Sequence, residues 1–357
     1  MSKATWYATI NQFAGYRDQK LINASFDNTV LNDVYYDGEL CAYFLDDYFD
    51  NATLYNSYAD HAYTTYITNY AAPASYQLPG FWCFLEGITE AFLRRGIAQR
   101  AVVLEAIMGD NGGRYMYVGS PGLNAEGRTP ETRHEISREF AYSILGWVQV
   151  ARTRTLTAPE IAFRDQRVTD SLTIIDDWCG TFTASYFRPF MGGITAHALI
   201  NDYETAANTV QKEAILTALI NLANYAWDSC WVEGSLAFNY TDRDIGNPDD
   251  LVPQASLNML IAAWFAWIYS VTYDTSWKTK AEQIFTGGEP IYNEEGFWVS
   301  GAYLGGTNPA GVLGKELDQQ IVWGPKYFTY VETAIPDPEI IVPAAPGSNV
   351  ILFNVFK

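Results

Sequence analysis

Basic residues and long apolar runs are both scarce in this sequence, and each shortage excludes a class of protein. Only 22 Lys and Arg accompany 41 Asp and Glu, so the formal net charge is −19 at pH 7. Nucleic acids and anionic membranes are bound mainly through Lys and Arg, which makes both poor partners here. No apolar run is long enough for a membrane span, and Met1 to Tyr16 lacks the basic and apolar regions of a secretory signal. We therefore expect a protein of the cytoplasm, or of a virion or extracellular assembly.

Cysteine and histidine are also scarce, which argues against a metal site. The four cysteines are far apart, form no C-x-x-C pair and are accompanied by three histidines, whereas a zinc site needs closely spaced ligands. Because each cysteine lies on or beside an apolar helical segment, we expect buried free thiols. We predict no metal and no cofactor, with Ca²⁺ as the one alternative. Its hard oxygen ligands would come from Asp242, Asp244, Asn247, Asp249 and Asp250, although this run lacks the register of the common calcium loop and its final Glu.

Apolar residues with helical spacing are abundant and indicate a repeated architecture. Hydrophobic residues make up 48% of the chain, which is ample for a sizeable core. In the segments 215–226 and 257–271 they fall on one face of a helix, and the links between such segments are short, which favours antiparallel neighbours. We predict an all-α fold with five helical pairs. They begin near residues 37, 82, 136, 190 and 254, and a sixth pair could combine the segments 18–30 and 313–322.

The two ends of the chain differ in character from this helical part. Residues 1–36 are predicted to be irregular, with strand-like alternation at 6–13 and a helix at 18–30. Residues 37–334 form the helical domain, and 335–357 are a proline-rich linker with a strand-like tail at 350–356. A lone strand needs a partner. The tail is expected to pair with 6–13 or with another subunit, which predicts a homo-oligomer or a larger assembly.

Helical pairs of about 45–60 residues need neighbours to cover their apolar faces, and a closed ring supplies one to every pair. In this rhythm, and in phrases such as RPFMGGITAHALINDY and SREFAYSILGWV, the chain resembles the α/α toroids of carbohydrate-active proteins such as polysaccharide lyases and unsaturated uronyl hydrolases. The resemblance covers about residues 37–286. It implies an (α/α)6 barrel and a polysaccharide or oligosaccharide ligand. It matches no single family, so it assigns no catalytic residue.

The densest polar segment is 128–139, RTPETRHEISRE, which ends a long connection rich in Gly and Tyr. Elimination from an acidic sugar needs a cation on its carboxylate and a base for its proton. Arg138 or Arg133 could supply the first and His134 the second. The alternative is a solvated first turn of a helix. The candidate catalytic residues are His134, Arg138, Arg133, Glu139 and Tyr240.

Aromatic residues make up 15% of the chain, and those in connections beside glycines or acids can stack on a sugar face. The candidate sugar contacts are Tyr115, Tyr117, Trp231, Glu233, Trp298, Tyr303 and Trp323. In a ring of antiparallel pairs the connections between pairs lie at one end. We therefore expect a cleft there, bounded by the connection 109–132, the start of the third pair and Trp298.

Two other functions remain open at this stage. Hydrolysis would need two carboxylates across the scissile bond, for which Asp46, Asp47, Glu86, Glu233 and Asp242 are candidates. A non-catalytic glycan-binding or structural subunit of a virion or filament would need no such residues. His197 lies between two alanines in a helical segment, and we interpret it as a buried core histidine.

Overall fold

The computed structural model describes residues 2–109, 113–124, 127–205, 208–292, 298–300 and 314–333, and this part is almost entirely helical. The all-α prediction is confirmed. The α-helices are α1 (Lys3–Asn23), α2 (Asn28–Asn32), α3 (Gly38–Phe49), α4 (Ala52–Tyr63), α5 (Glu86–Arg95), α6 (Ala98–Met108), α7 (Ser137–Thr153), α8 (Ala158–Cys179), α9 (Pro189–Thr205), α10 (Thr209–Cys230), α11 (Met259–Thr272), α12 (Thr275–Gly288) and α14 (Gly314–Thr333).

Short elements occupy the connections between these helices. A π-helix, η1 (Thr64–Ala71), continues α4, and 3₁₀ turns form η2 (Gly80–Trp82), η4 (Arg133–Ile136), η5 (Glu233–Ser235) and η6 (Ala255–Leu257). Two antiparallel strand pairs join β1 (Trp231–Val232) to β2 (Ala237–Phe238) and β3 (Pro290–Tyr292) to β4 (Trp298–Ser300). The described strands therefore lie in connections between helices.

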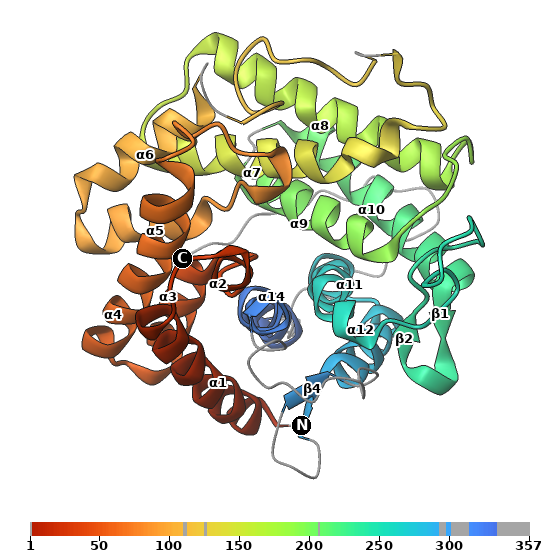
Figure 1. Cartoon of the computed structure of the whole chain (residues 1–357). Helices are drawn as coiled ribbons and strands as arrows, with labels where there is room; N and C mark the ends of the chain where they lie inside the picture. The colour runs from red at the N-terminus through yellow and green to blue at the C-terminus, as the bar shows by residue number, and fades with distance from the viewer. Residues whose placement is uncertain are drawn as a thin grey trace, which may run out of the picture.

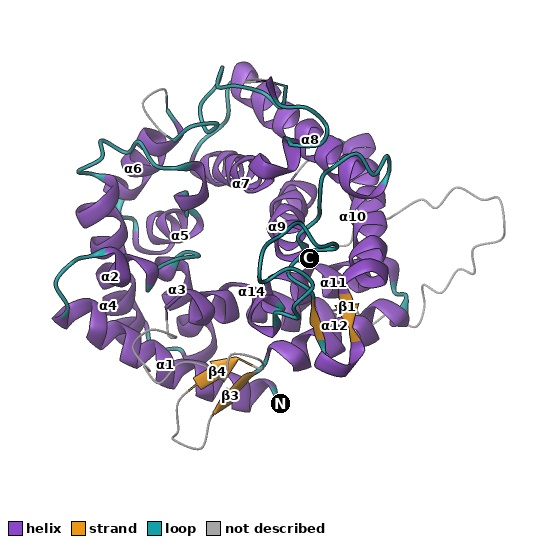
Figure 2. Cartoon of the chain, turned by 45° about the vertical axis from the view of Figure 1, so that its right-hand side comes forward, coloured by secondary structure: helices purple, strands orange, loops and turns teal. Residues whose placement is uncertain are grey.

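The helices form an inner and an outer layer around a common centre (Figures 1 and 2). The five predicted pairs are present: α3 packs on α4, α5 on α6, α7 on α8, α9 on α10, and α11 on α12. The first helix of each pair also packs on the first helix of the next pair. Because α11 contacts α14 and α14 contacts α3, this circuit of inner helices returns to its start.

The strand predicted at 6–13 is wrong, because this segment lies inside α1. The Ser2 side chain caps the helix by accepting a hydrogen bond from the Thr5 N–H at 3.2 Å. The buried residues Trp6, Ile10 and Phe13 recur at helical spacing. The helix predicted at 18–30 is also wrong, since α1 ends at Asn23.

Helix α1 packs against α14, so the two form the sixth pair. The Trp6 indole N–H donates to the Gln320 side-chain oxygen at 3.1 Å, and the Arg17 guanidinium forms a buried ion pair with Asp318. A side chain at Gly324 would collide with the Trp6 ring, so glycine is required within this helix. The segment predicted to be irregular at the start of the chain is therefore part of the helical domain.

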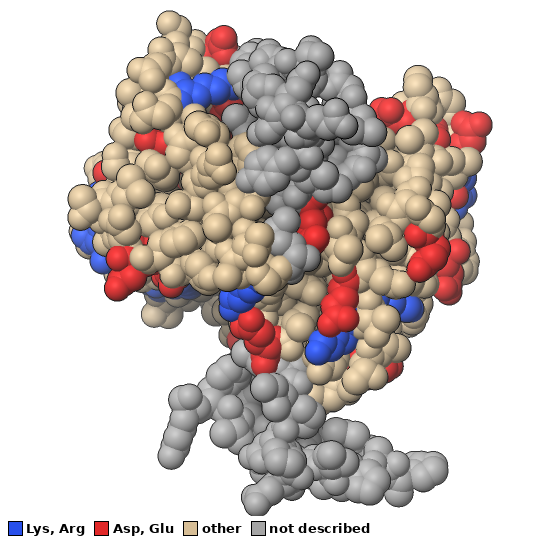
Figure 3. All heavy atoms as spheres, turned by 90° about the horizontal axis from the view of Figure 1, so that it is seen from below, with Lys and Arg blue, Asp and Glu red and all other residues tan. Residues whose placement is uncertain are grey.

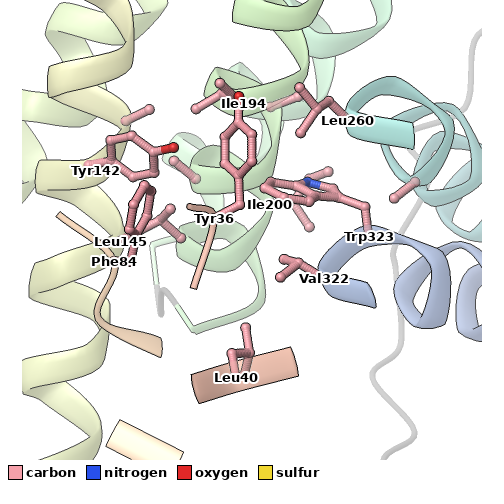
Figure 4. Close-up of a cluster of buried hydrophobic side chains, with 14 of the residues drawn as sticks. Tyr36, Leu40, Phe84, Tyr142, Leu145, Ile194, Ile200, Leu260, Val322 and Trp323 are labelled. Atoms are coloured by element: carbon pink, nitrogen blue, oxygen red, sulfur yellow. The ribbon is translucent and has the colours of Figure 1, made fainter. Parts of the chain in front are cut away.

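Large side chains fill the space that the inner helices surround (Figure 4). The Tyr36 ring lies at 90° to the Trp323 ring with centroids 5.4 Å apart, and Phe84 meets Tyr142 at 89° and 5.4 Å. Aromatic pairs in such edge-to-face contact are favourable beyond the area that they bury. We call this region the central cluster, and it is a packed core.

The two ends of the helical layers differ in complexity. Turns within pairs are short, as at 50–51, 96–97 and 273–274, and Gly96 adopts the left-handed φ of 66° that its turn requires. Connections from one pair to the next are longer, as at 109–136 and 231–258. Because paired helices are antiparallel, these long connections gather where the inner helices begin.

Two further predictions concern exposure and bonding. All four cysteines are free, as predicted, and Cys179 alone is half-buried while the others are buried. The Cys41 thiol donates to an Asp318 carboxylate oxygen at 3.2 Å.

No described helix combines the length and apolar character that a membrane crossing needs.

Candidate functional site

The connections that lead into α7 and α9 lie against each other and hold the candidate site. The Glu131 carbonyl accepts hydrogen bonds from the Ser185 N–H at 3.1 Å and from the Ser185 hydroxyl at 2.9 Å. His134 lies in η4, directly before α7. Arg188 directly precedes α9, which begins with Pro189, a residue whose fixed φ suits the first helical position. These local structures place His134 and Arg188 at the starts of neighbouring inner helices.

Four polar or aromatic side chains meet at this point. The His134 ring contacts the edge of the Tyr186 ring, with centroids 4.4 Å apart. The Arg188 guanidinium lies 4.8 Å from the Tyr186 ring centre and 4.9 Å from that of Tyr240. Tyr240 in turn stacks on Phe190 at 5.4 Å. The structure thus brings together His134 and Tyr240, both predicted, with Tyr186 and Arg188; we call these four residues the rim site.

Several buried polar atoms beside the rim site have no hydrogen-bond partner among the described residues. They are both ring nitrogens of His134, the indole nitrogen of Trp178 and Nε of Arg188. The same three side chains, with Tyr186 and Met191, line a cavity of about 10 Å³, which is roughly the space that one water needs. Buried polar groups are paired in most proteins, so unpaired ones that converge on one cavity require an explanation.

The electrostatic surroundings favour a neutral imidazole and an available cation. Burial lowers the pKa of His134 and Arg188 adds to this shift, whereas Glu135, Asp242 and a hydrogen bond to the Glu131 backbone oppose it. Arg188 forms no ion pair with any carboxylate of the described residues. The neighbouring Asp242 is already occupied, because it accepts hydrogen bonds from the Phe187 N–H at 2.9 Å and from the Tyr225 hydroxyl at 2.6 Å. The rim site therefore offers a proton acceptor beside a guanidinium.

Arg138 and Glu139 lie one helical turn further along α7. The Arg138 guanidinium donates to the Tyr35 hydroxyl at 3.3 Å and lies 4.8 Å from the Phe81 ring centre. Glu139 packs so closely on Gly80 that any side chain there would collide with it. Burial raises the pKa of the Glu139 carboxyl, against the opposing effect of Arg138. Both predicted residues are thus partly buried near the rim site, on the side of α7 that faces η2.

No protein-family model, curated protein or solved structure matches this chain. Function must therefore be argued from the geometry of the site. The sequence analysis missed Tyr186, Arg188 and Trp178, although one signal was present. Arg188 comes before a proline that opens a helix, in a connection between two pairs, and such a position lies at the elaborate end of the structure.

Arg133 does not join the rim site. Its guanidinium donates to the Asn124 side chain at 2.7 Å and lies 3.5 Å from an Asp177 carboxylate oxygen. These partners tie the connection before α7 to the end of α8. Arg133 is therefore better explained as a structural link than as the cation that the sequence suggested.

Two predicted sugar contacts are core residues instead. Tyr115 is buried, with its ring centre 5.6 Å from that of Phe140. Trp323 was expected in a connection, but it lies in α14, is 4% exposed and meets the His197 ring at 5.2 Å. The adjacent glycine and proline suggested a loop. In the structure both are accommodated within the helix, where Gly324 makes room for another side chain.

Trp231 and Glu233 do lie together, at a separate position near the end of α10. The Trp231 ring is half-buried and stacks on Trp227 with centroids 4.5 Å apart, and its indole N–H donates to Glu233 at 2.7 Å. The second oxygen of Glu233 accepts from the Gln283 amide at 3.0 Å. A half-buried indole beside an exposed carboxylate can contact a sugar, so these two residues stay predicted binding residues.

The other predicted sugar contacts are only partly within the described residues. Tyr117 is half-buried in the connection before α7. The backbone of Trp298 lies in β4, while its side chain and all of Tyr303 lie outside the described part. The predicted strand at 350–356 lies outside it as well. The proposed cleft between the 109–132 connection and Trp298 therefore stays a prediction.

In the acidic run at 242–250, side chains accept hydrogen bonds from backbone N–H groups of the same segment. Asp250 accepts hydrogen bonds from the N–H groups of Ile245 and Asn247, each at 2.8 Å, and from the Thr241 hydroxyl at 3.1 Å. These bonds explain the acids as turn formers. In the part of the chain that the structure describes, no three His, Cys, Asp or Glu side chains are grouped so as to hold a metal ion.

A second polar group lies in the middle of the inner layer. Glu86 of α5 accepts a hydrogen bond from His197 of α9 at 3.0 Å and one from the Lys326 ammonium of α14 at 3.2 Å. Burial alone would raise the pKa of the Glu86 carboxyl, but Lys326 and His197 outweigh it and hold this pKa below its ordinary value. Burial, followed by Lys326, lowers the pKa of His197. These three residues, the central triad, link alternate inner helices.

The carboxylates considered for hydrolysis are dispersed. Glu86 belongs to the central triad, and Asp242 is held by Tyr225 and a backbone N–H. Asp47 forms an exposed ion pair with Arg94 at 2.6 Å. These three acids occupy different parts of the structure and bind different partners. Their arrangement does not favour a carboxylate pair acting on one bond.

Proposed function

We propose that the protein binds an acidic polysaccharide at the rim site and cleaves it by β-elimination. The observation that carries this proposal is the convergence of unpaired buried atoms from His134, Trp178 and Arg188 on one cavity. Leaving a buried polar group unpaired costs about 1–3 kcal/mol. A bound water or a ligand group can supply the missing partners, and in our proposal a polar group of the ligand takes the place of the one water that the cavity would hold.

The rim site contains the groups that elimination requires. Arg188 would bind the uronate carboxylate and so acidify the neighbouring C5–H bond. His134, kept neutral by burial, would take that proton. The electron pair of the C–H bond becomes the C4–C5 double bond, the C4–O bond breaks, and Tyr240 would donate its proton to the leaving oxygen. Because Arg188 lies between Tyr186 and Tyr240, acid and base would stand on opposite sides of the bound carboxylate.

The charge distribution is compatible with an acidic substrate despite the net charge of −19. The coloured part of the face in Figure 3 carries small groups of acidic and of basic side chains among many uncharged ones, and no continuous basic patch is visible there. A polyanion would thus be held by individual arginines. Arg138 and Arg188 fit this role, since neither is paired with a carboxylate of the described residues.

The test follows two products at once. The protein is incubated with alginate, polygalacturonate, hyaluronan and a neutral glucan, while ultraviolet absorbance of unsaturated ends and release of reducing ends are measured. Elimination predicts that both signals rise together on at least one acidic polymer. Reducing ends without absorbance would indicate hydrolysis. Binding without either signal would replace the enzyme by a glycan-binding protein.

A further inference from the structure

Arg138 occupies an unusual environment for an arginine in this chain. It lies in the first turn of α7, with its guanidinium 4.8 Å from the Phe81 ring centre. Its one hydrogen bond among the described residues is the 3.3 Å contact with the Tyr35 hydroxyl, and its Nε atom is buried without a partner there. Arg138 is only partly exposed, so water cannot surround its charge fully.

No carboxylate of the described residues forms a direct ion pair with the Arg138 guanidinium. Several other arginines are paired with carboxylates, as in Arg94 with Asp47 at 2.6 Å and Arg154 with Glu105 at 2.5 Å, whereas Arg138 and Arg188 are not. The neighbouring Glu139 acts on Arg138 electrostatically but forms no ion pair with it. In a chain with 41 acidic and 22 basic residues, a partly buried arginine without a direct ion pair is unexpected. An anion from outside would remove this imbalance.

The surroundings of Arg138 hold it in place. The Tyr35 hydroxyl donates to the Phe81 carbonyl at 3.3 Å, and the Tyr35 ring makes edge contacts with Trp82 at 4.5 Å and Phe84 at 5.0 Å. A planar guanidinium stacked on an aromatic ring keeps its edge available for two parallel hydrogen bonds to a carboxylate. The position is therefore organised before any ligand arrives.

We infer that Arg138 forms a second carboxylate-binding subsite, which takes an acidic sugar other than the one bound at Arg188. Arg188 lies where α7 meets α9, whereas Arg138 faces Tyr35 and Phe81 beside η2. Two separate cations, one in the rim site and one beside it, could each bind a carboxylate of a sugar chain in which every unit is acidic. The ligand is thus an oligouronate with at least two acidic units. This inference rests on the proposed function for the choice of sugar acids as ligands.

Binding of oligouronates of increasing length tests the subsite directly. Calorimetry is performed with saturated oligomers of one to six units, prepared from alginate and from polygalacturonate. Affinity should rise in a step at the length whose second carboxylate reaches Arg138. Arg138→Ala should remove this step, weakening longer oligomers roughly 10- to 100-fold while leaving the shortest unchanged. Arg138→Lys should restore part of it, because lysine keeps the charge without the paired hydrogen bonds.

A matched control is available nearby. Arg128 already pairs with Glu135 at 2.9 Å, so Arg128→Ala should keep the length step. A step that persists in Arg138→Ala, or that never occurs in the wild type, overturns the subsite. A length step without any cleavage overturns the elimination reaction and leaves the subsite in place.

The ligand offers a test that does not depend on folding of the variant. Oligomers whose carboxyl groups have been chemically reduced to alcohols should bind the wild type without a length step. A step of equal size with these neutral oligomers would show that Arg138 does not recognise a carboxylate.

Discussion

His134 and His197 are buried to almost the same extent, at 4% and 5% exposure, and burial lowers the pKa of both. They differ in their partners. His197 is bonded to the Glu86 side chain in the central triad, whereas His134 bonds to no side chain of the described residues and interacts only with the Glu131 backbone. Burial and the direction of the pKa shift are therefore the same in the two histidines. They differ in that a carboxylate and an ammonium hold His197, while no charged side chain bonds to His134.

The largest expected effect is the loss of turnover in His134→Gln. If His134 is the base, the rate of elimination should fall roughly 10²- to 10⁴-fold. The free energy of unfolding should change little, since His134 bonds to no other side chain of the described residues and the glutamine amide can still donate to the Glu131 backbone. Initial rates of absorbance increase measure the first, and urea unfolding the second. His61→Gln is the control, because His61 is a half-exposed histidine that bonds to Asp18. Equal activity in both variants would exclude His134 as the base.

Replacement of Glu86 should have the opposite effect from replacement of His134: a large loss of folding stability. Glu86→Gln leaves Lys326 without its anion in the middle of the inner layer, and breaking a buried ion pair costs about 3–5 kcal/mol. Chemical denaturation measures this loss. Asp47→Asn, which breaks an exposed pair with Arg94, should cost at most about 1 kcal/mol. A Glu86→Gln protein as stable as the wild type would show that the central triad does not support the fold.

The smallest effect concerns pH. Because burial lowers the pKa of His134 in the folded state, the unfolded chain takes up the proton first as pH falls. Stability from this residue is complete above the ordinary pKa of 6.5 and decreases below it. The rate of elimination should likewise rise with pH to a plateau, with its midpoint below 6.5. Denaturation and rate measurements from pH 5 to 8 check both. A midpoint above 6.5 would contradict a buried neutral base.

The five helical pairs could be predicted because their apolar faces repeat within each helix. Helix α1 could not be predicted in this way, because Trp6 is buried against Gln320 and Gly324, which lie more than 300 residues away in sequence. The same limit applies to the site. His134 and Tyr240 were identified singly, but their grouping depends on Arg188 between two tyrosines, and sequence spacing does not encode that arrangement. Trp323 was predicted to lie in a connection because a glycine follows it, and glycine is common in turns. In the structure Gly324 lies within α14, where it makes room for the Trp6 ring.

The pairing of α1 with α14 also sets the order in which the molecule can fold. At ribosomal rates of about 5–20 residues per second, Trp6 and Arg17 precede Gln320 and Asp318 by roughly 15–60 s. During that interval α1 can pack on α3 and α4, but the sides of α1 and α3 that will meet α14 have no cover, and Glu86 lacks the ammonium of Lys326. Contacts of such long range form slowly, because the intervening chain must first be ordered. A nascent chain that stops before α14 should therefore be held by chaperones and cleaved readily by proteases, even with all five earlier pairs in place.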